Sequence, residues 1–436
     1  MIPAGRRRIG RLLALGGSLL AAVACPLDAA GDSPSSPLPY RRLRDTALGY
    51  HGSSDDLATL AEIPLGWFGP TNFDDPLTGD VWWSVGHAVQ EANATAAALR
   101  IRLVPTWTSD PWGSGVARLT RMIYDEQPIA LLGSVDSGST HLAEQIAAKA
   151  NLPLVSPLAT DPSVTLAGVP WMFSCAPSDA AIAHTLVDAL PSPTPDDTGE
   201  TVPRVAMIAG TDHDSRMTAR EVLREFSRRG RSPDFRFDAP PASPNLASVR
   251  TSLEAVRPSA ILVVANPEDA ARWVLALRET GAGPPLVGND QLAPPDRPLL
   301  FGTHVMGHTR FRRLAGRAAE DVRFPILFAP DPTDPVAARF VATFTRDRGH
   351  SPDYASALAY DAARLLVDAV RAAGPNRARV REALVRLSPR SGLAGRIEFD
   401  GTGQNMRTTL GMGTIRDGQL VRLSNPHSAT QSAASP

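Results

Sequence analysis

The chain contains only 2 cysteines among its 436 residues, which excludes a fold held together by a disulfide framework. Its formal net charge of −1 excludes the strong positive field with which proteins attract nucleic acid or anionic membranes. The phosphate-binding patterns GxxxxGKS and GxGxxG are absent, which argues against a nucleotide ligand. The catalytic patterns GxSxG and HExxH and any Cys/His cluster are absent too. We therefore expect a protein that is not an enzyme, has no catalytic residues and holds neither metal nor cofactor.

The one conspicuous apolar run lies at the N-terminus and is too short to span a bilayer comfortably. Arginines at 6, 7, 8 and 11 precede it, and small residues follow it, which predicts a signal peptide over 1–24. The same place resembles a lipobox, although Ala22 stands where leucine is usual, so lipid anchoring through Cys25 stays open. We expect a periplasmic or extracytoplasmic protein with a tether and N-terminal arm over 25–61 and a disordered tail over 425–436.

Between these ends, predicted strands alternate with predicted helices, and the alternation restarts after Pro177. Such alternation is typical of parallel sheets with crossover helices. The restart predicts two similar α/β lobes, and a chain of this length is long enough for both. We assign 62–177 and 328–393 to lobe 1, and 178–327 and 394–424 to lobe 2. Near the C-terminus, a strand over 395–399 is predicted to turn at Asp400-Gly401 and pair with a strand over 410–415.

The most informative stretch is 129–162, which predicts a strand, a helix from His141 to Ala150 and a second strand. Small polar residues follow each strand, at 134–140 and at 156–160. The carboxyl ends of parallel strands share one sheet edge, where ligands bind in open α/β sheets. Hydroxyls and amide N–H groups at a helix start form a neutral site for an anion such as a carboxylate. The alternative is that the same hydroxyls only cap the helix.

With these features in order, the chain over about 63–423 resembles a type I periplasmic binding protein of the branched-chain amino-acid (leucine/isoleucine/valine) branch. The resemblance rests on the order of several short motifs rather than on any one of them. They are Gly69-Pro70, Gly133…Ser137, the 156–162 loop, Ala176-Pro177-Ser178-Asp179, Gly288-Asn289-Asp290, Ala359-Tyr360-Asp361-Ala362 and Gly395-Arg396-Ile397-Glu398-Phe399-Asp400.

This resemblance implies two Rossmann-like lobes with parallel sheets, joined by a three-strand hinge with crossings near Pro177, Leu327 and Leu393. It implies that the lobes close on a small ligand.

The resemblance also implies roles for individual residues. Ser137, with Gly138 beside it, would hold the carboxylate of an amino acid. Leu158 would add a backbone group and Thr160 a hydroxyl. Asp290 of the second lobe would hold the ammonium, although a turn residue is the alternative there.

The chain departs from the family pattern in the second lobe, where Asp214 stands near a position that is often aromatic. A second acidic residue would favour a basic or otherwise polar ligand. His213 lies between Asp212 and Asp214, which could suggest a metal or acid/base site, but a solvated turn is the more common meaning of this pattern.

The implied function is an extracytoplasmic solute-binding protein of an ABC-type uptake system. Its partners would be a small amino-acid-like ligand and an ABC permease in the membrane, and no nucleic acid is expected. The alternative is a non-catalytic ligand-sensing receptor subunit on the same fold. The sequence does not separate transport from sensing.

Overall fold

The computed structural model describes residues 62–95, 100–166, 169–191, 194–195, 201–202, 204–240, 246–279 and 298–423. The predicted signal peptide, the tether and the tail lie outside these residues, and so does Asp290. Within the described part of the chain, no helix is both long and apolar enough to cross a membrane.

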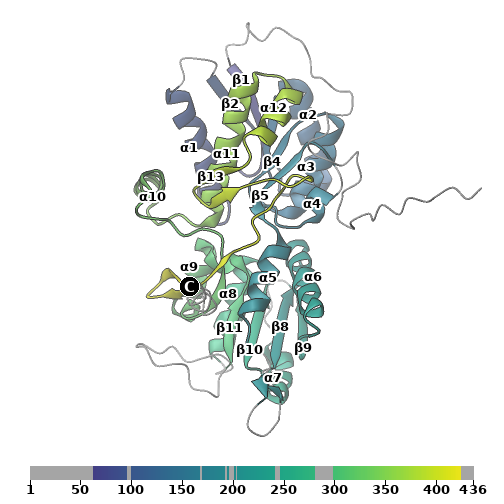
Figure 1. Ribbon diagram of the computed structural model, residues 1–436, viewed down its shortest axis with the longest axis vertical. Coiled ribbons are helices and arrows are strands. Elements are labelled where there is room, and N and C mark those ends of the chain that lie inside the picture. Colours follow the sequence, from purple (N-terminus) through teal and green to yellow (C-terminus); the bar gives the residue numbers. More distant parts are fainter. Residues whose placement is uncertain are drawn as a thin grey trace, which may run out of the picture. The chain divides into compact units, whose positions relative to one another are not determined.

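The first lobe is built on a six-stranded sheet in which every strand pairing is parallel (Figure 1). Its strand order is β15–β5–β4–β3–β1–β2. All residues of β3, β4 and β5 are buried, as expected for parallel strands that are covered on both faces. The strands are β1 (Glu62–Phe68), β2 (Arg100–Thr106), β3 (Ala130–Gly133), β4 (Leu154–Ser156), β5 (Met172–Pro177) and β15 (Gln404–Asn405).

Two groups of helices cover the two faces of this sheet. Trp67 and Phe173 pack among residues of α1, α10, α11 and α12 on one face. Leu131 and Leu154 pack against α2 and α3 on the other. The helices are α1 (Gly79–Thr95), α2 (Val116–Glu126), α3 (Ser137–Lys149), α4 (Ser163–Leu166), α10 (Pro335–Arg348), α11 (Tyr354–Ala373) and α12 (Arg377–Arg386), with the π-helical turn η3 (Pro111–Gly115) before α2.

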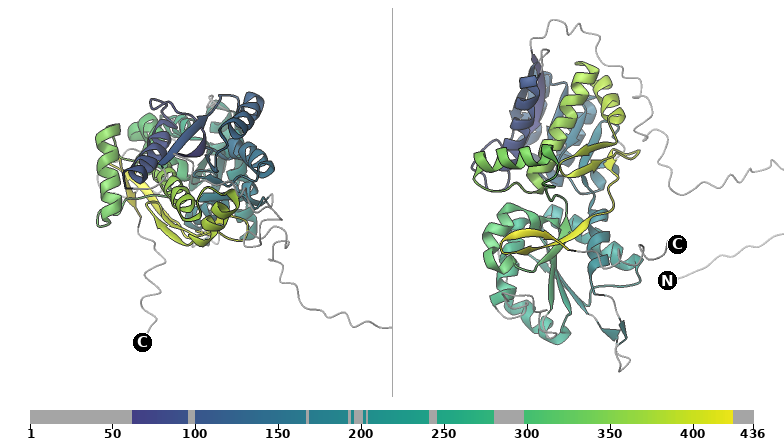
Figure 2. Two further views of the ribbon diagram at one scale, coloured as in Figure 1. Left: turned by 90° about the horizontal axis from the view of Figure 1, so that it is seen from above. Right: turned by 60° about the vertical axis from the view of Figure 1, so that its left-hand side comes forward.

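The second lobe is built on a seven-stranded sheet with the order β17–β16–β12–β11–β10–β8–β9. Its strands are parallel except for the edge, where β16 runs antiparallel to β12 and β17 (Figure 2). α5 and α6 cover one face, and α7, α8 and α9 cover the other. The strands are β8 (Val205–Gly210), β9 (Phe235–Ala239), β10 (Ala260–Val264), β11 (Leu299–Gly302), β12 (Arg323–Ile326), β16 (Gly411–Arg416) and β17 (Gln419–Arg422). The helices are α5 (Asp179–Ala189), α6 (His213–Arg228), α7 (Leu246–Val256), α8 (Pro267–Glu279), α9 (Thr309–Ala315), η4 (His304–Gly307) and η5 (Gly316–Ala319).

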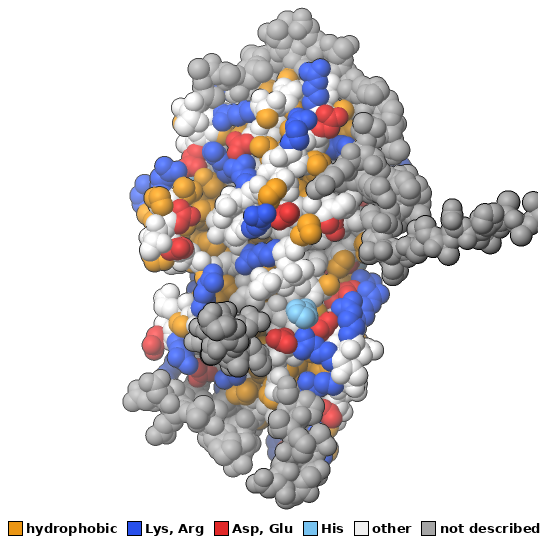
Figure 3. Space-filling model, in the orientation of Figure 1, with side chains coloured by type: hydrophobic (Ala, Val, Ile, Leu, Met, Phe, Trp, Pro, Cys, Tyr) orange, Lys and Arg blue, Asp and Glu red, His pale blue; other side chains and the backbone are white. Residues whose placement is uncertain are grey.

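Two further strand pairs are short and antiparallel. They are β6 (Thr194–Pro195) with β7 (Thr201–Val202), and β13 (Arg390–Gly392) with β14 (Gly395–Ile397). On the face of the molecule in Figure 3, basic and acidic side chains are interspersed, in keeping with the formal net charge of −1.

Over the residues that the structure describes, the backbone passes from one sheet to the other three times: between β5 and α5, between β12 and α10, and between β15 and β16. The first two passages agree with the predicted crossings near Pro177 and Leu327. The third lies after Asn405 rather than near Leu393, because β15 is still part of the first sheet. The side-chain amides of Gln404 and Asn405 donate to the carbonyls of Ala176 and Cys175, at 2.9 and 2.6 Å, and hold the chain on β5.

The predicted fold class, two α/β lobes with parallel sheets, is confirmed by these two sheets. Two local predictions are wrong. β14 pairs with β13, and β16 pairs with β12 and β17, so the predicted hairpin between 395–399 and 410–415 does not form. Helix α3 begins at Ser137 rather than His141, because Asp136 caps it by accepting from the Ser139 N–H at 2.6 Å.

Candidate functional site

The two polar loops predicted from the sequence meet at Ser137. This residue opens α3 at the carboxyl end of β3, and it is 1% exposed. Its hydroxyl oxygen accepts from the N–H groups of Thr160 and Asp161 at 3.2 and 3.3 Å. A hydroxyl can accept two hydrogen bonds and donate one, so these contacts leave the Ser137 hydrogen for a further acceptor. The two loops therefore form one frame at the helix start.

Asp214 brings a carboxylate from the second lobe to this frame. The Ser137 N–H donates to the Asp214 carboxylate at 3.2 Å. Burial and the neighbouring negative charge of Asp136 raise the pKa of Asp214. The N–H group at the start of α3 thus already binds a carboxyl oxygen of the chain itself. The hydrogen bond from this N–H favours the charged form of Asp214, but burial and Asp136 outweigh it.

Thr160 is directed at a second buried carboxyl group, that of Asp179 at the start of α5. The Thr160 carbonyl accepts from the Asp179 N–H at 2.7 Å, and its hydroxyl hydrogen-bonds to the Asp179 carboxyl. The Thr218 hydroxyl donates to the same carboxyl at 2.9 Å. Burial raises the pKa of Asp179 to about 7 despite these hydrogen bonds. The Thr160 hydroxyl, which was predicted to contact a ligand, therefore has a partner within the chain, the Asp179 carboxyl group.

The remaining predicted residues differ in what they contribute. Leu158 is half-buried and packs against two apolar clusters. Gly138 has room for a side chain, because an added Cβ would lie 3.5 Å from Asp136 and 3.6 Å from the His213 ring. Asp290 lies outside the described residues, so its proposed contact with an ammonium group stays a prediction.

The sequence-based reasoning missed a cluster of His141, Asp161 and His213 beside this frame. The Asp161 Oδ2 atom lies 3.4 Å from His141 Nε2 and 3.8 Å from His213 Nε2. In the sequence, His141 directly follows the first polar loop and Asp161 directly follows the second, which is a signal for their proximity. His213 lies between Asp212 and Asp214 in the sequence, but its close partners, Asp161 and His141, come from the first lobe.

Ion pairs and hydrogen bonds fix the charges in this cluster. Hydrogen bonds to Asp161 and Glu144 raise the pKa of His141 to about 9. Burial alone would raise the pKa of Asp161, but hydrogen bonds from His141 and Ser163 lower it below its usual range. Arg220 of α6 adds a cation 3.3 Å from Asp161 Oδ1. Asp161 is thus an ionised carboxylate surrounded by cationic groups.

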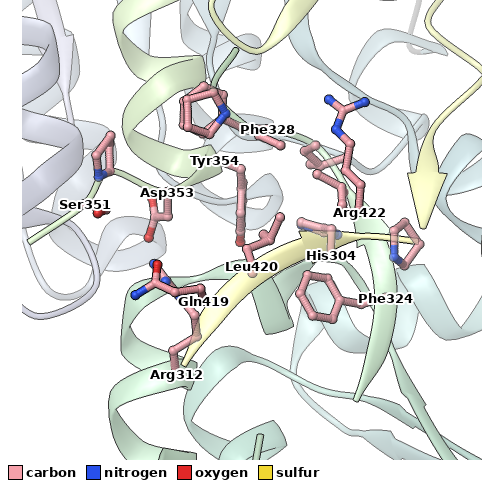
Figure 4. A pocket seen from close by; sticks show the side chains of 17 residues that line it. His304, Arg312, Phe324, Phe328, Ser351, Asp353, Tyr354, Gln419, Leu420 and Arg422 are labelled. Atoms are coloured by element: carbon pink, nitrogen blue, oxygen red, sulfur yellow. The ribbon is translucent and has the colours of Figure 1, made fainter. Parts of the chain in front are cut away.

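A separate cavity of about 320 Å³ lies between η4, β12, β17 and the start of α11 (Figure 4). His304 and Tyr354 approach each other there, with 5.1 Å between their ring centroids. Burial lowers the pKa of His304 to about 3, so this imidazole is neutral. The cavity is large enough for a small molecule, but its lining includes none of the residues predicted for ligand binding.

Comparison with known proteins agrees with this two-lobe fold. A family model described as a periplasmic binding protein matches residues 79–419. No curated protein sequence matches the chain.

Solved structures resemble the chain over most of its length. A leucine-binding protein from Thermotoga maritima is 20% identical, with a TM-score of 0.70, over 84% of this chain and 99% of its own. A branched-chain amino acid transporter substrate-binding protein from Streptococcus pneumoniae, in complex with isoleucine, is 19% identical with a TM-score of 0.68, over 83% and 100%. A solute-binding protein of an ABC transporter from R. palustris, in complex with benzoate, is 15% identical with a TM-score of 0.68, over 83% and 96%. At these identities the similarity establishes the fold alone.

Proposed function

Because the chain belongs to the periplasmic binding protein family, we propose that it captures a small carboxylate-bearing solute, such as an amino acid, outside the cytoplasm and delivers it to an ABC permease. The solute would bind between the two lobes at the start of α3. The structural relatives bind leucine, isoleucine or benzoate, and each of these ligands carries a carboxylate.

The observation that supports this proposal is the bond from the Ser137 N–H to the Asp214 carboxylate at 3.2 Å. It supports the start of α3 as a place that binds a carboxyl oxygen. A bound solute would replace Asp214 there and would also receive the Ser137 hydroxyl hydrogen. Asp214 would then be free to accept from the ammonium group of an amino acid, as a zwitterion requires.

The test is a titration of the purified protein with leucine, isoleucine, lysine and benzoate, followed by thermal unfolding and by calorimetry. A ligand at 100 times its dissociation constant should stabilise the protein by about 2.7 kcal/mol. Ser137→Ala removes one hydrogen bond to a charged group, which contributes about 1.5–3 kcal/mol. We expect the variant to bind its best ligand roughly 10- to 100-fold more weakly.

Two further variants sharpen this test. Thr95→Ala also removes a hydroxyl, but one that bonds only within α1, so its affinity should equal that of the unmodified protein. Asp214→Asn should weaken binding of an amino acid, because the ammonium group would lose its carboxylate partner. The same change should strengthen binding of benzoate, because benzoate has no ammonium group and would no longer compete with the Asp214 carboxyl for the Ser137 N–H. Equal affinities in Ser137→Ala and the unmodified protein would exclude this site.

A further inference from the structure

His141, Asp161 and His213 present three metal-ligating atoms, all within 4.8 Å of one another. We propose that this cluster binds a divalent transition-metal ion, with Zn²⁺ as the probe, and that the ion cross-links the two lobes. This inference goes beyond the proposed function, since solute capture requires no metal.

The spacing of the three atoms suits a tetrahedral ion. Bonds of about 2.0–2.1 Å in a tetrahedron place two ligand atoms about 3.3 Å apart. The distances from Asp161 Oδ2 to His141 Nε2 and to His213 Nε2 are 3.4 and 3.8 Å. All three atoms lie within 4.8 Å of one another, so a rotation of the partly exposed His213 ring toward the other two ligands would complete three of four tetrahedral positions. Two imidazoles and one carboxylate form a donor set that Zn²⁺ uses in proteins.

The groups behind His141 and Asp161 orient these two ligands as metal ligands are usually oriented. Glu144, which is 2% exposed, has a carboxylate oxygen 3.5 Å from His141 Nδ1, so the Nε2 atom is the one that faces the cluster. Ser163 holds Asp161 from two sides, since its hydroxyl donates to Oδ2 at 2.6 Å and its N–H donates to Oδ1 at 3.0 Å. A carboxylate behind a ligating histidine is a typical partner that fixes the ring and increases its basicity.

Other groups around the cluster would have to respond to the ion. A metal would replace the proton on His141, so binding should release a proton and weaken as the pH falls. Arg220 approaches the other oxygen of Asp161 at 3.3 Å, and its side chain is 39% exposed, so it can move away into solvent. The Ser163 hydroxyl lies 3.1 Å from His141 Nε2 and would have to give up that contact.

The cluster joins elements of both lobes. His141 lies in α3 and Asp161 in the loop after β4, both of the first lobe, whereas His213 opens α6 of the second. An ion held by all three would stabilise the arrangement in which the lobes meet. Zn²⁺ should therefore raise the unfolding temperature and favour the closed form.

The experiment uses protein without a polyhistidine tag and without added solute, so that its outcome is independent of the proposed function. Calorimetric titration with Zn²⁺ should give one site, and Mg²⁺, which prefers oxygen ligands, should give none. Co²⁺ should produce the intense visible absorption of a tetrahedral complex. Glu144→Gln should weaken Zn²⁺ binding by roughly 10- to 100-fold, and His213→Ala by at least as much.

His213 is 42% exposed, so its replacement should not disturb folding. The matched control is His184→Ala, since His184 is another exposed histidine, on α5, and pairs with Glu225 at 3.1 Å outside the cluster. It should bind Zn²⁺ with unchanged affinity. The proposal is overturned if His213→Ala and His141→Ala retain the affinity of the unmodified protein, or if His184→Ala loses as much.

Discussion

Asp161 and Asp179 are both 1% exposed, but the regions around them supply different partners. Asp161, in the loop after β4, is surrounded by the cationic groups of His141 and Arg220. Asp179, at the start of α5, receives hydrogen bonds from the hydroxyls of Thr160 and Thr218. The pKa of Asp161 is lowered below its usual range, whereas burial raises the pKa of Asp179 to about 7.

The comparison shows that the kind of partner, and not burial alone, decides the ionisation of a carboxyl group. Cations compensate the burial of Asp161, so it stays charged and able to pair with an arginine or a metal ion. Hydroxyls compensate that of Asp179 only in part, so the group is largely neutral in mild acid. The two regions meet in the same loop of the first lobe. Thr160 bonds to Asp179, and the next residue is Asp161.

The largest effect is expected from the pH dependence that Asp179 creates. Because its pKa is raised from 3.8 to about 7 on folding, the folded state binds the proton more tightly than the unfolded state. Its contribution to stability is fully present below pH 4 and is lost as the pH rises through 7. The shift corresponds to about 4 kcal/mol. Asp179→Asn should lack this loss, as measured by denaturant unfolding from pH 4 to pH 8.

The difference between the two unfolding curves isolates Asp179 from other groups. Asp361, whose pKa burial also raises to about 7, is present in both proteins and cancels. Identical pH profiles for the variant and the unmodified protein would mean that Asp179 is ionised and that the contrast with Asp161 does not exist.

Asp161→Asn should have the next largest effect, and of opposite sign at neutral pH. The change keeps the shape but removes the charge that the His141 and Arg220 cations need. Breaking a buried ion pair typically costs 3–5 kcal/mol, and we expect about 3 kcal/mol because both partners are partly exposed. Since the pKa of Asp161 is lowered, this stabilisation is present above pH 4 and is lost as the pH falls. Urea unfolding at pH 7 measures the expected loss in the free energy of unfolding. Urea unfolding at pH 3 shows whether this loss disappears in acid.

Local patterns predicted much of the fold. The alternation of strands and helices and its restart after Pro177 predicted two α/β lobes, and the two sheets confirm them. The two loops at one sheet edge do meet, at the Ser137 hydroxyl. The family that the motif order indicates is confirmed by the match over 79–419.

What the sequence did not predict depends on contacts between distant segments. Nothing local to Gln404 and Asn405 indicates that their amides bind the carbonyls of β5. Similarly, His213 gains its partners only where α6 meets α3, so its neighbours in sequence, Asp212 and Asp214, do not indicate them. The role of Asp290 stays a prediction.

Ser137→Ala tests the contact between the two polar loops, on which the positions of Thr160 and Asp161 depend. The change leaves the N–H groups of Thr160 and Asp161 without the hydroxyl oxygen that accepts from them. An unsatisfied buried donor costs about 1–3 kcal/mol, and we expect a loss of about 2 kcal/mol in the free energy of unfolding. Thr95→Ala, in which no N–H group loses its acceptor, should change stability by less than about 0.5 kcal/mol. Equal losses in both would show that the two loops do not depend on this contact.

Arg220→Ala should have the smallest effect on stability, because a partly exposed ion pair contributes less than about 1 kcal/mol and is screened by salt. Its effect on metal binding should be opposite in direction. The guanidinium approaches Asp161 at 3.3 Å, so its removal takes away a positive charge that repels an incoming ion. Zn²⁺ should then bind several-fold more tightly, most clearly at low ionic strength. An unchanged or weaker Zn²⁺ affinity would mean that Asp161 is not a ligand of the ion, and that its negative charge serves only to pair with the cations of the two lobes.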